Sequence, residues 1–228
     1  FYGCSELTKL VLPMDLEHIG SYAFLGAEEL ELYFMNEQLP EYLDENWDRS
    51  IRGYYLGIVA IEENEEYRYA VLSSGGIAIL EYKGEETTVD LSKVDLGGPI
   101  YQIGGGAFRN STVRSIILPD TLKSILAEAF RNSSLESVVI PDNVTFIGRE
   151  AFAYTDIREV TFSGTSKLSV IEQYAFSGAK NLQTITIPAS VTTMGTGVFM
   201  GSGLTEVFFD EGIRLSEIPA RAFAETKL

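Results

Sequence analysis

One dipeptide, Ala-Phe, recurs along this chain at a nearly constant spacing. Its phenylalanines are Phe24, Phe108, Phe130, Phe152, Phe176 and Phe223, and Phe199 follows a valine in the same frame. From Phe108 onward the successive spacings are 22, 22, 24, 23 and 24 residues. A period of this length is typical of a solenoid, in which each repeat buries its apolar face by stacking on its neighbours.

The residues between the phenylalanines keep a strict framework. An apolar residue stands five positions before each phenylalanine and another stands eight before it, as Ile147 and Val144 do for Phe152. After each phenylalanine comes a segment of the form L-x-x-L-x-L, such as 135–140. Length varies only in the two loops, which a solenoid tolerates because its core positions stay in register. The pattern predicts a leucine-rich-repeat solenoid, α/β or mainly β, with a parallel sheet of short strands on its concave face.

The other half of each repeat has the form Ile-Gly-x-x-Ala-Phe and is expected to return along the opposite side. Its glycines are predicted to adopt a turn conformation that only glycine takes easily; they are Gly20, Gly104, Gly148 and Gly195. The rings are predicted to stack into a spine, each stabilising the fold by roughly 1.5–3 kcal/mol through burial.

The frame is less regular before residue 48. We assign Leu30, Tyr33 and Met35 to the inward positions of one strand. Trp47 stands five residues after Tyr42 and is interpreted as the spine residue of a degenerate turn.

From residue 48 the frame is lost. Two alternating segments, 67–72 and 77–82, flank Ser-Ser-Gly-Gly and predict a β-hairpin. Residues 87–91 resemble a repeat strand, and the full frame restarts at Ile100. We therefore divide the chain into N-terminal repeats (1–47), a β insert (48–91) and C-terminal repeats (92–228).

The insert has two interpretations. We favour a cap for the C-terminal repeats, because a solenoid must shield its apolar ends; a specific contact made by the insert itself is the alternative. The frame is cut at Phe1 and at Leu228, so we expect a fragment of a longer array, in which neither a signal peptide nor an anchor is visible.

Charge limits the partners. Lys and Arg number 17 against 33 Asp and Glu, which gives 17 − 33 = −16. Such a chain repels phosphates and anionic lipids, so we expect no nucleic-acid partner. No apolar stretch approaches the roughly 20 residues that span a bilayer, so we expect no membrane insertion of this segment.

Catalytic and metal-binding residue sets are missing from the sequence. His18 is the only histidine and Cys4 the only cysteine, so a multi-histidine metal site and an internal disulfide are excluded by count. The run 104–106 has three glycines but lacks the Lys-Ser/Thr of a phosphate loop. The acidic run 62–66 lacks the spacing of a calcium loop. We expect no enzyme, no cofactor and no metal.

The frame L-x-x-I/V-x-I-P-x-x-V-x-x-I-G-x-x-A-F, best matched at 135–152 and 182–199, resembles the BspA-like (treponemal-type) leucine-rich repeats. The segment 67–108 also resembles one in repeat proteins of gut Firmicutes. Leu126 and Glu172 depart from the frame, since glycine is usual there. The resemblance implies a secreted or surface-attached protein of a host-associated bacterium, in a family of which several members bind host proteins such as fibronectin and fibrinogen.

Strand residues that do not point inward are expected to form the concave binding face. One predicted column is Lys9, Ser115, Ser137, Glu159, Thr184 and Glu206, and the other is Val11, Ile117, Val139, Thr161, Thr186 and Phe208. The apolar members of the second column suggest a contact surface, although β-branched residues also suit any strand. Phe208 is the strongest candidate for an interface anchor.

Three functions compete on this basis. The first is a surface-exposed, adhesin-like module that binds an extracellular or host protein through the concave sheet. The second is a structural spacer or stalk without a ligand of its own. The third, less favoured, is a carbohydrate-binding attachment of a larger surface enzyme, supported only by the tyrosines near the insert, Tyr54, Tyr55, Tyr67, Tyr69 and Tyr82.

Overall fold

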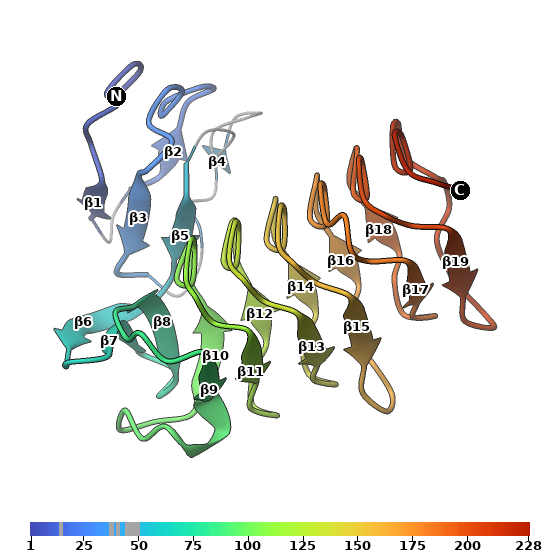
Figure 1. Cartoon of the computed structure of the whole chain (residues 1–228). Helices are drawn as coiled ribbons and strands as arrows, with labels where there is room; N and C mark the ends of the chain where they lie inside the picture. Colours follow the sequence, from blue (N-terminus) through green and yellow to red (C-terminus); the bar gives the residue numbers. More distant parts are fainter. Residues whose placement is uncertain (14–15, 37–38, 40–41, 44–50) are drawn as a thin grey trace.

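The computed structural model describes residues 1–13, 16–36, 39, 42–43 and 51–228. These residues form a solenoid of short parallel strands in two arrays, as the repeat frame predicted (Figure 1). In the described ranges the only helix is a short 3-10 turn, η1 (Leu91–Lys93). None there is long and apolar enough to cross a membrane.

Each turn of the C-terminal array contributes one strand to the side that carries the L-x-x-L-x-L segments. Four of them pair in parallel, in the order β9 (Thr88–Asp90), β11 (Ser115–Ile117), β13 (Ser137–Ile140) and β15 (Glu159–Phe162). The next two, β17 (Thr184–Ile187) and β19 (Glu206–Phe209), form a separate two-stranded sheet. We call the outward-pointing side chains of these six strands the strand face.

The return side carries a second sheet that the sequence analysis did not predict. Its parallel part runs through β10 (Ile100–Ile103), β12 (Ser124–Ile125), β14 (Phe146–Ile147), β16 (Val170–Ile171) and β18 (Thr193–Met194). These strands are mostly two residues long, too short for alternation to reveal them. The sheet continues beyond β10 into the insert.

The predicted hairpin is confirmed as β7 (Tyr67–Leu72) and β8 (Ile77–Tyr82), with β6 (Ile58–Glu63) at its outer edge. Strand β8 pairs in parallel with β10 and so takes the place of a return strand. The insert therefore extends the return sheet of the C-terminal array beyond its first turn.

The predicted ring spine is confirmed. From Phe108 to Phe223 the centroids of successive rings lie 5.1–5.7 Å apart, with planes within 16° of parallel. Tyr82 of the hairpin stacks on Phe108 at 5.1 Å, and Tyr67 contacts Tyr82 at 5.5 Å. The hairpin thus extends the spine of the array as well as its return sheet.

Left-handed backbone positions fall elsewhere than expected. From Gly106 to the end of the chain, the residue two before and the residue two after each spine phenylalanine have φ between 55° and 68°. Gly148 and Gly195 are not among these positions. A Cβ atom at Gly148 would lie 2.6 Å from the backbone nitrogen of Ala127, and one at Gly195 would lie 2.2 Å from that of Gln173. The predicted turn conformation is therefore wrong, and these glycines are needed because successive turns approach closely.

The N-terminal array has the same architecture. Strands β1 (Lys9–Leu12), β3 (Glu31–Phe34) and β5 (Gly53–Tyr55) form a parallel sheet, so that β5, from within the predicted insert, continues this array. On the return side β2 (His18–Ile19) pairs with β4 (Tyr42–Leu43).

One register in this array was predicted wrongly. Leu32 pairs with Leu10 and lies in the core, whereas Tyr33 points to the opposite side and Met35 is 50% exposed. A one-residue slip exchanges the two faces of a strand, and here both faces are buried, with Glu31 and Tyr33 on the outward one. The assignment of Trp47 falls outside the described residues.

Candidate binding face

The outward side of the N-terminal sheet is covered by the hairpin. Tyr33 and Tyr55 are fully buried, and their rings stack 5.3 Å apart. They pack against hairpin side chains that point away from the core of the C-terminal array, namely Ala70, Leu72, Ala78 and Leu80. Tyr33 is the register partner of Val11, so the side expected to be open for binding is an intramolecular interface.

The three-glycine run forms part of the same junction. The Gly105 N–H donates to the hydroxyl of Tyr55 at 2.9 Å. A Cβ atom at Gly104 would lie 2.5 Å from that hydroxyl, and one at Gly105 would lie 2.6 Å from the carbonyl oxygen of Arg52. Burial, and then the Glu31 carboxylate, raise the pKa of Tyr55 well above that of an ordinary phenol, so this group stays protonated at neutral pH. The glycines therefore allow the N-terminal array to approach.

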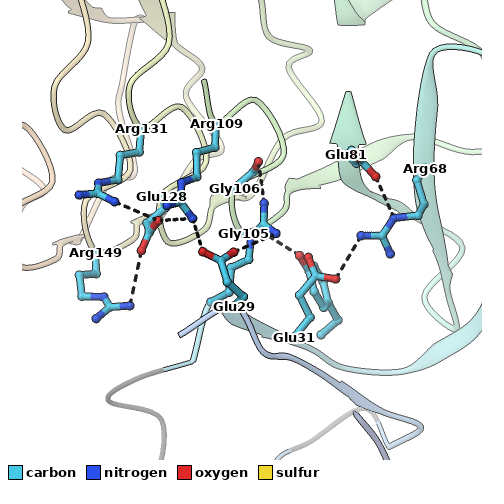
Figure 2. A network of polar contacts seen from close by, with 12 residues as sticks. Glu29, Glu31, Arg68, Glu81, Gly105, Gly106, Arg109, Glu128, Arg131 and Arg149 are labelled. Carbon is cyan, nitrogen blue, oxygen red and sulfur yellow. Dashed lines mark hydrogen bonds and ion pairs between the residues drawn. The ribbon is translucent and has the colours of Figure 1, made fainter. Parts of the chain in front are cut away.

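Ion pairs join the two arrays across this junction (Figure 2). Glu31, only 3% exposed, accepts a hydrogen bond from the Tyr33 hydroxyl and pairs with Arg68 at 3.3 Å. Glu29 pairs with Arg109 at 2.7 Å and with Arg52 at 3.6 Å. Each glutamate comes from the N-terminal array, and its partners include an arginine of the hairpin or of the C-terminal array.

A third carboxylate, that of Glu128, lies among three arginines of the C-terminal array. Glu128 lies 3.3 Å from Arg109, 3.7 Å from Arg131 and 3.9 Å from Arg149 (Figure 2). Arg149 also donates to the carbonyl oxygen of Ile51 at 3.3 Å. Buried charges need partners of this kind, because an unpaired one would carry a large desolvation cost.

The two predicted binding residues of the N-terminal array are therefore separated from the other ten. Val11 is 53% exposed and Lys9 is also exposed, both on the edge strand β1. The Lys9 ammonium lies 5.1 Å from the centre of the Tyr33 ring. These residues do not share a sheet with the strand face of the C-terminal array.

The other ten predicted residues all lie exposed on the strand face. Its first column is Ser115, Ser137, Glu159, Thr184 and Glu206, and its second is Ile117, Val139, Thr161, Thr186 and Phe208. Ile117, Val139 and Phe208 are 50%, 55% and 52% exposed. Ile117 and Val139 lie on adjacent paired strands, whereas Phe208 lies apart from them beyond two threonines.

A groove that the sequence analysis missed interrupts this face. Strands β15 and β17 do not pair, and a space of about 560 Å³ lies between them. Its lining includes five predicted residues, Glu159, Thr161, Thr184, Thr186 and Phe208. Two sequence features mark it. The loop between Phe162 and Leu168 is two residues longer than the corresponding loops of the turns beside it, and the loop between Phe176 and Leu182 is one residue longer.

The tyrosines near the insert do not form an exposed platform. Tyr55, Tyr67 and Tyr69 are 0%, 3% and 8% exposed, and Tyr82 stacks in the ring spine. Tyr54 packs edge-on against Phe34. The support that these residues offered for carbohydrate binding is therefore lost, because their ring faces are used in packing.

The residues considered for chemistry are scattered. His18 and Cys4 are both exposed, in β2 and in the first loop. Within the described ranges, no group of three or more His, Cys, Asp or Glu side chains is arranged to hold a metal ion.

Solved structures show the same fold at low identity. The pneumococcal vaccine antigen PcpA is 22% identical with a TM-score of 0.55, and the match covers 68% of this chain and 51% of PcpA. A leucine-rich repeat protein from Eubacterium ventriosum is 13% identical with a TM-score of 0.50, over 96% of this chain and 65% of that one. The chain thus spans about half the length of the PcpA structure. No curated protein matches it significantly.

The repeat frame identifies the family to which the chain belongs. The family model described as the BspA type leucine rich repeat region matches in six copies, over residues 1–46 and 87–228. The gap between the two matched ranges contains the hairpin β7–β8, where the frame is lost. With most of its length matched, the chain belongs to the family of BspA-type leucine-rich repeats.

Proposed function

We infer that this chain is a non-enzymatic protein-binding module of a bacterial surface protein, which binds an extracellular or host protein through the strand face of the C-terminal array. The observation that carries the proposal is the exposure of Ile117 and Val139 on adjacent strands, with the exposed ring of Phe208 further along. Exposed apolar side chains gathered on one face of a rigid sheet are typical of a contact surface.

The junction between the arrays supports this choice of face. The N-terminal sheet uses its outward side to contact the hairpin, through the buried Tyr33 and Tyr55. The strand face carries no such internal cover, since all ten predicted residues on it are exposed. An adhesin-like role would therefore depend on β11 to β19.

A location at the bacterial surface is supported by family membership and by PcpA, a protein described as a vaccine antigen. The first test of location is antibody labelling of intact cells of the source bacterium. Labelling that appears only after the cells are broken would contradict a surface location.

The binding experiment compares variants that each add one carboxylate to the surface. We would measure binding of the chain to immobilised purified host extracellular proteins, fibronectin and fibrinogen among them, by surface plasmon resonance. Val139→Glu and Phe208→Glu place a carboxylate on the strand face, and loss of an interface anchor costs more than about 2 kcal/mol, or roughly thirtyfold in affinity. Val59→Glu is the matched control, because Val59 is 67% exposed on β6, away from the strand face.

The competing function is a rigid spacer without a ligand. The continuous ring spine favours it, since the spine joins the hairpin and every turn of the C-terminal array into one stack. A spacer predicts that no host protein binds, or that the parent and both face variants bind equally. A protein bound by the parent and by Val59→Glu, but not by the face variants, would exclude it.

A further inference from the structure

The groove lies where β15 and β17 belong to separate sheets, and the loop after β15 is hydrogen-bonded to the preceding turn. The Ser163 N–H donates to the carbonyl oxygen of Ile140 at 3.0 Å, and the Lys167 N–H donates to that of Asp142 at 3.0 Å. The Lys167 ammonium also donates to the side-chain oxygen of Asn143 at 2.7 Å. The loop is thus bonded to the turn before it, and its residues 164–166 line the groove.

Hydroxyl groups are the most numerous polar side chains in the lining of this groove, beside an equal number of apolar residues. Thr161 of β15 lies on one wall and Thr184 and Thr186 of β17 lie on the other, and all three are exposed. Further hydroxyls come from the loops at one end, Thr165, Ser166 and Ser190. A hydroxyl can both donate and accept a hydrogen bond, so this lining suits a ligand that presents hydroxyls itself.

Two carboxylates and an aromatic ring complete the groove. Glu159 and Asp210 are exposed members of the lining and can accept hydrogen bonds only. The ring of Phe208, 52% exposed, adds an apolar surface beside Thr186. A sugar ring has both matching features, a rim of hydroxyls and an apolar face of C–H groups that packs on an aromatic ring.

We propose that the groove between β15 and β17 binds a short neutral oligosaccharide. Its volume of about 560 Å³ falls within the range of ligand sites, which is roughly 300–1,000 Å³. The net charge of −16 and the carboxylates of the lining disfavour sialylated or uronic glycans. A basic peptide is less suited than a sugar, because the hydroxyls outnumber the carboxylates and Arg158 lies in the same lining.

This site overlaps the protein-binding surface proposed above at β15 to β19, where Phe208 belongs to both, but it does not depend on Ile117 or Val139. Ile117 lies on β11, two strands away from β15, and is not part of the groove lining. Ile117→Glu therefore tests the protein-binding face alone. Oligosaccharide binding should be the same in Ile117→Glu as in the parent.

The test is isothermal titration calorimetry of the chain with three neutral trisaccharides, namely chitotriose, mannotriose and maltotriose. Trigalacturonic acid serves as the anionic control of the same length. We expect at least one neutral trisaccharide to bind with a Kd of about 1 mM or tighter, and trigalacturonic acid not to bind. Thr161→Val and Thr186→Val each remove one hydroxyl at nearly constant volume and should raise that Kd roughly three- to tenfold. Thr88→Val is the matched control, since Thr88 is exposed on β9 of the same strand face and outside the groove.

Three results would overturn the proposal. The first is the absence of heat of binding with every neutral trisaccharide at about 10 mM. The second is an equal Kd for Thr161→Val, Thr186→Val and Thr88→Val. The third is binding of pentalysine, but of no sugar, which would assign the groove to a basic peptide. Circular dichroism of each variant checks that the solenoid is folded, so a loss of binding can be attributed to the groove.

Discussion

Replacing one ring of the spine tests how the solenoid is held together. Phe152 is fully buried, and its ring lies 5.2 Å from Phe130 on one side and 5.2 Å from Phe176 on the other, with planes 5° from parallel in both cases. Phe152→Ala leaves a cavity in two interfaces between turns and should destabilise the array by about 3–5 kcal/mol. Of this, each aromatic contact accounts for roughly 0.5–1.5 kcal/mol beyond burial.

Phe223 offers the matched comparison. It is only partly buried, and the one spine ring that it contacts is Phe199, at 5.7 Å. With one interface instead of two and less area buried, Phe223→Ala should cost about half as much, roughly 1–2 kcal/mol. Phe152→Leu keeps most of the volume but loses both ring contacts, so it should cost roughly 1–3 kcal/mol.

Urea titration followed by circular dichroism measures all three variants. A loss of 3–5 kcal/mol lowers the midpoint by on the order of 1–2 M, given the usual dependence of unfolding free energy on urea. An equal shift for Phe152→Ala and Phe223→Ala would show that stacking between turns is not what stabilises the array. A shift for Phe152→Ala no larger than that of Phe152→Leu would refute the cavity argument.

Three further predictions concern the junction, the close approach of turns and the buried phenol of Tyr67. Tyr55→Phe leaves the buried Gly105 N–H without its acceptor and should lower the unfolding free energy by about 1–3 kcal/mol, whereas an unchanged urea midpoint would show that the bond is unimportant. Gly195→Ala places a Cβ atom against a backbone nitrogen and should cost about 1–3 kcal/mol, seen as a lower Tm; an unchanged Tm would contradict the close approach. Burial raises the pKa of Tyr67 to about 12, against ~10 when unfolded, so the stability it contributes is complete below pH 10 and is lost as the pH rises through 12. Urea midpoints measured at several values between about pH 9 and pH 12 check this, and an identical loss of stability in Tyr67→Phe would refute it.

The repeat class could be predicted from sequence because every turn must place the same residue types inward. Ile147 and Val144 stand at fixed distances before Phe152, and both are fully buried. A framework repeated at this spacing predicts stacked turns without any knowledge of distant contacts. The hairpin 67–82 was also predicted with its strand bounds, because its alternation and its Ser-Ser-Gly-Gly turn are local features.

The exposure of the strand face followed from the same alternation. Ser137 and Val139 point outward because Val138 and Ile140 point into the core. Period two makes the outward set predictable once the inward set is known. What those residues bind depends on chemistry outside the repeat frame.

The tertiary structure alone decided how the two arrays meet. Glu29 and Arg109 pair across 80 positions of sequence, and nothing in the repeat period relates them. Docking buries the outward side of β3, so all four of its residues are buried, and the sequence alone did not show that Tyr33 faces the hairpin and not the core. Leu126, which departs from the usual glycine, packs against this same cluster.

The groove also required the tertiary structure. The sequence shows that the loop after Phe162 is longer, but a longer loop can lean toward either neighbouring turn. In the folded chain it bonds to Ile140 and Asp142 of the preceding turn, and β15 and β17 lie in separate sheets. Periodic burial can be predicted from the sequence because it follows from the local spacing of apolar residues. The direction of a loop and the docking of two arrays depend on contacts between residues that only the folded chain brings together.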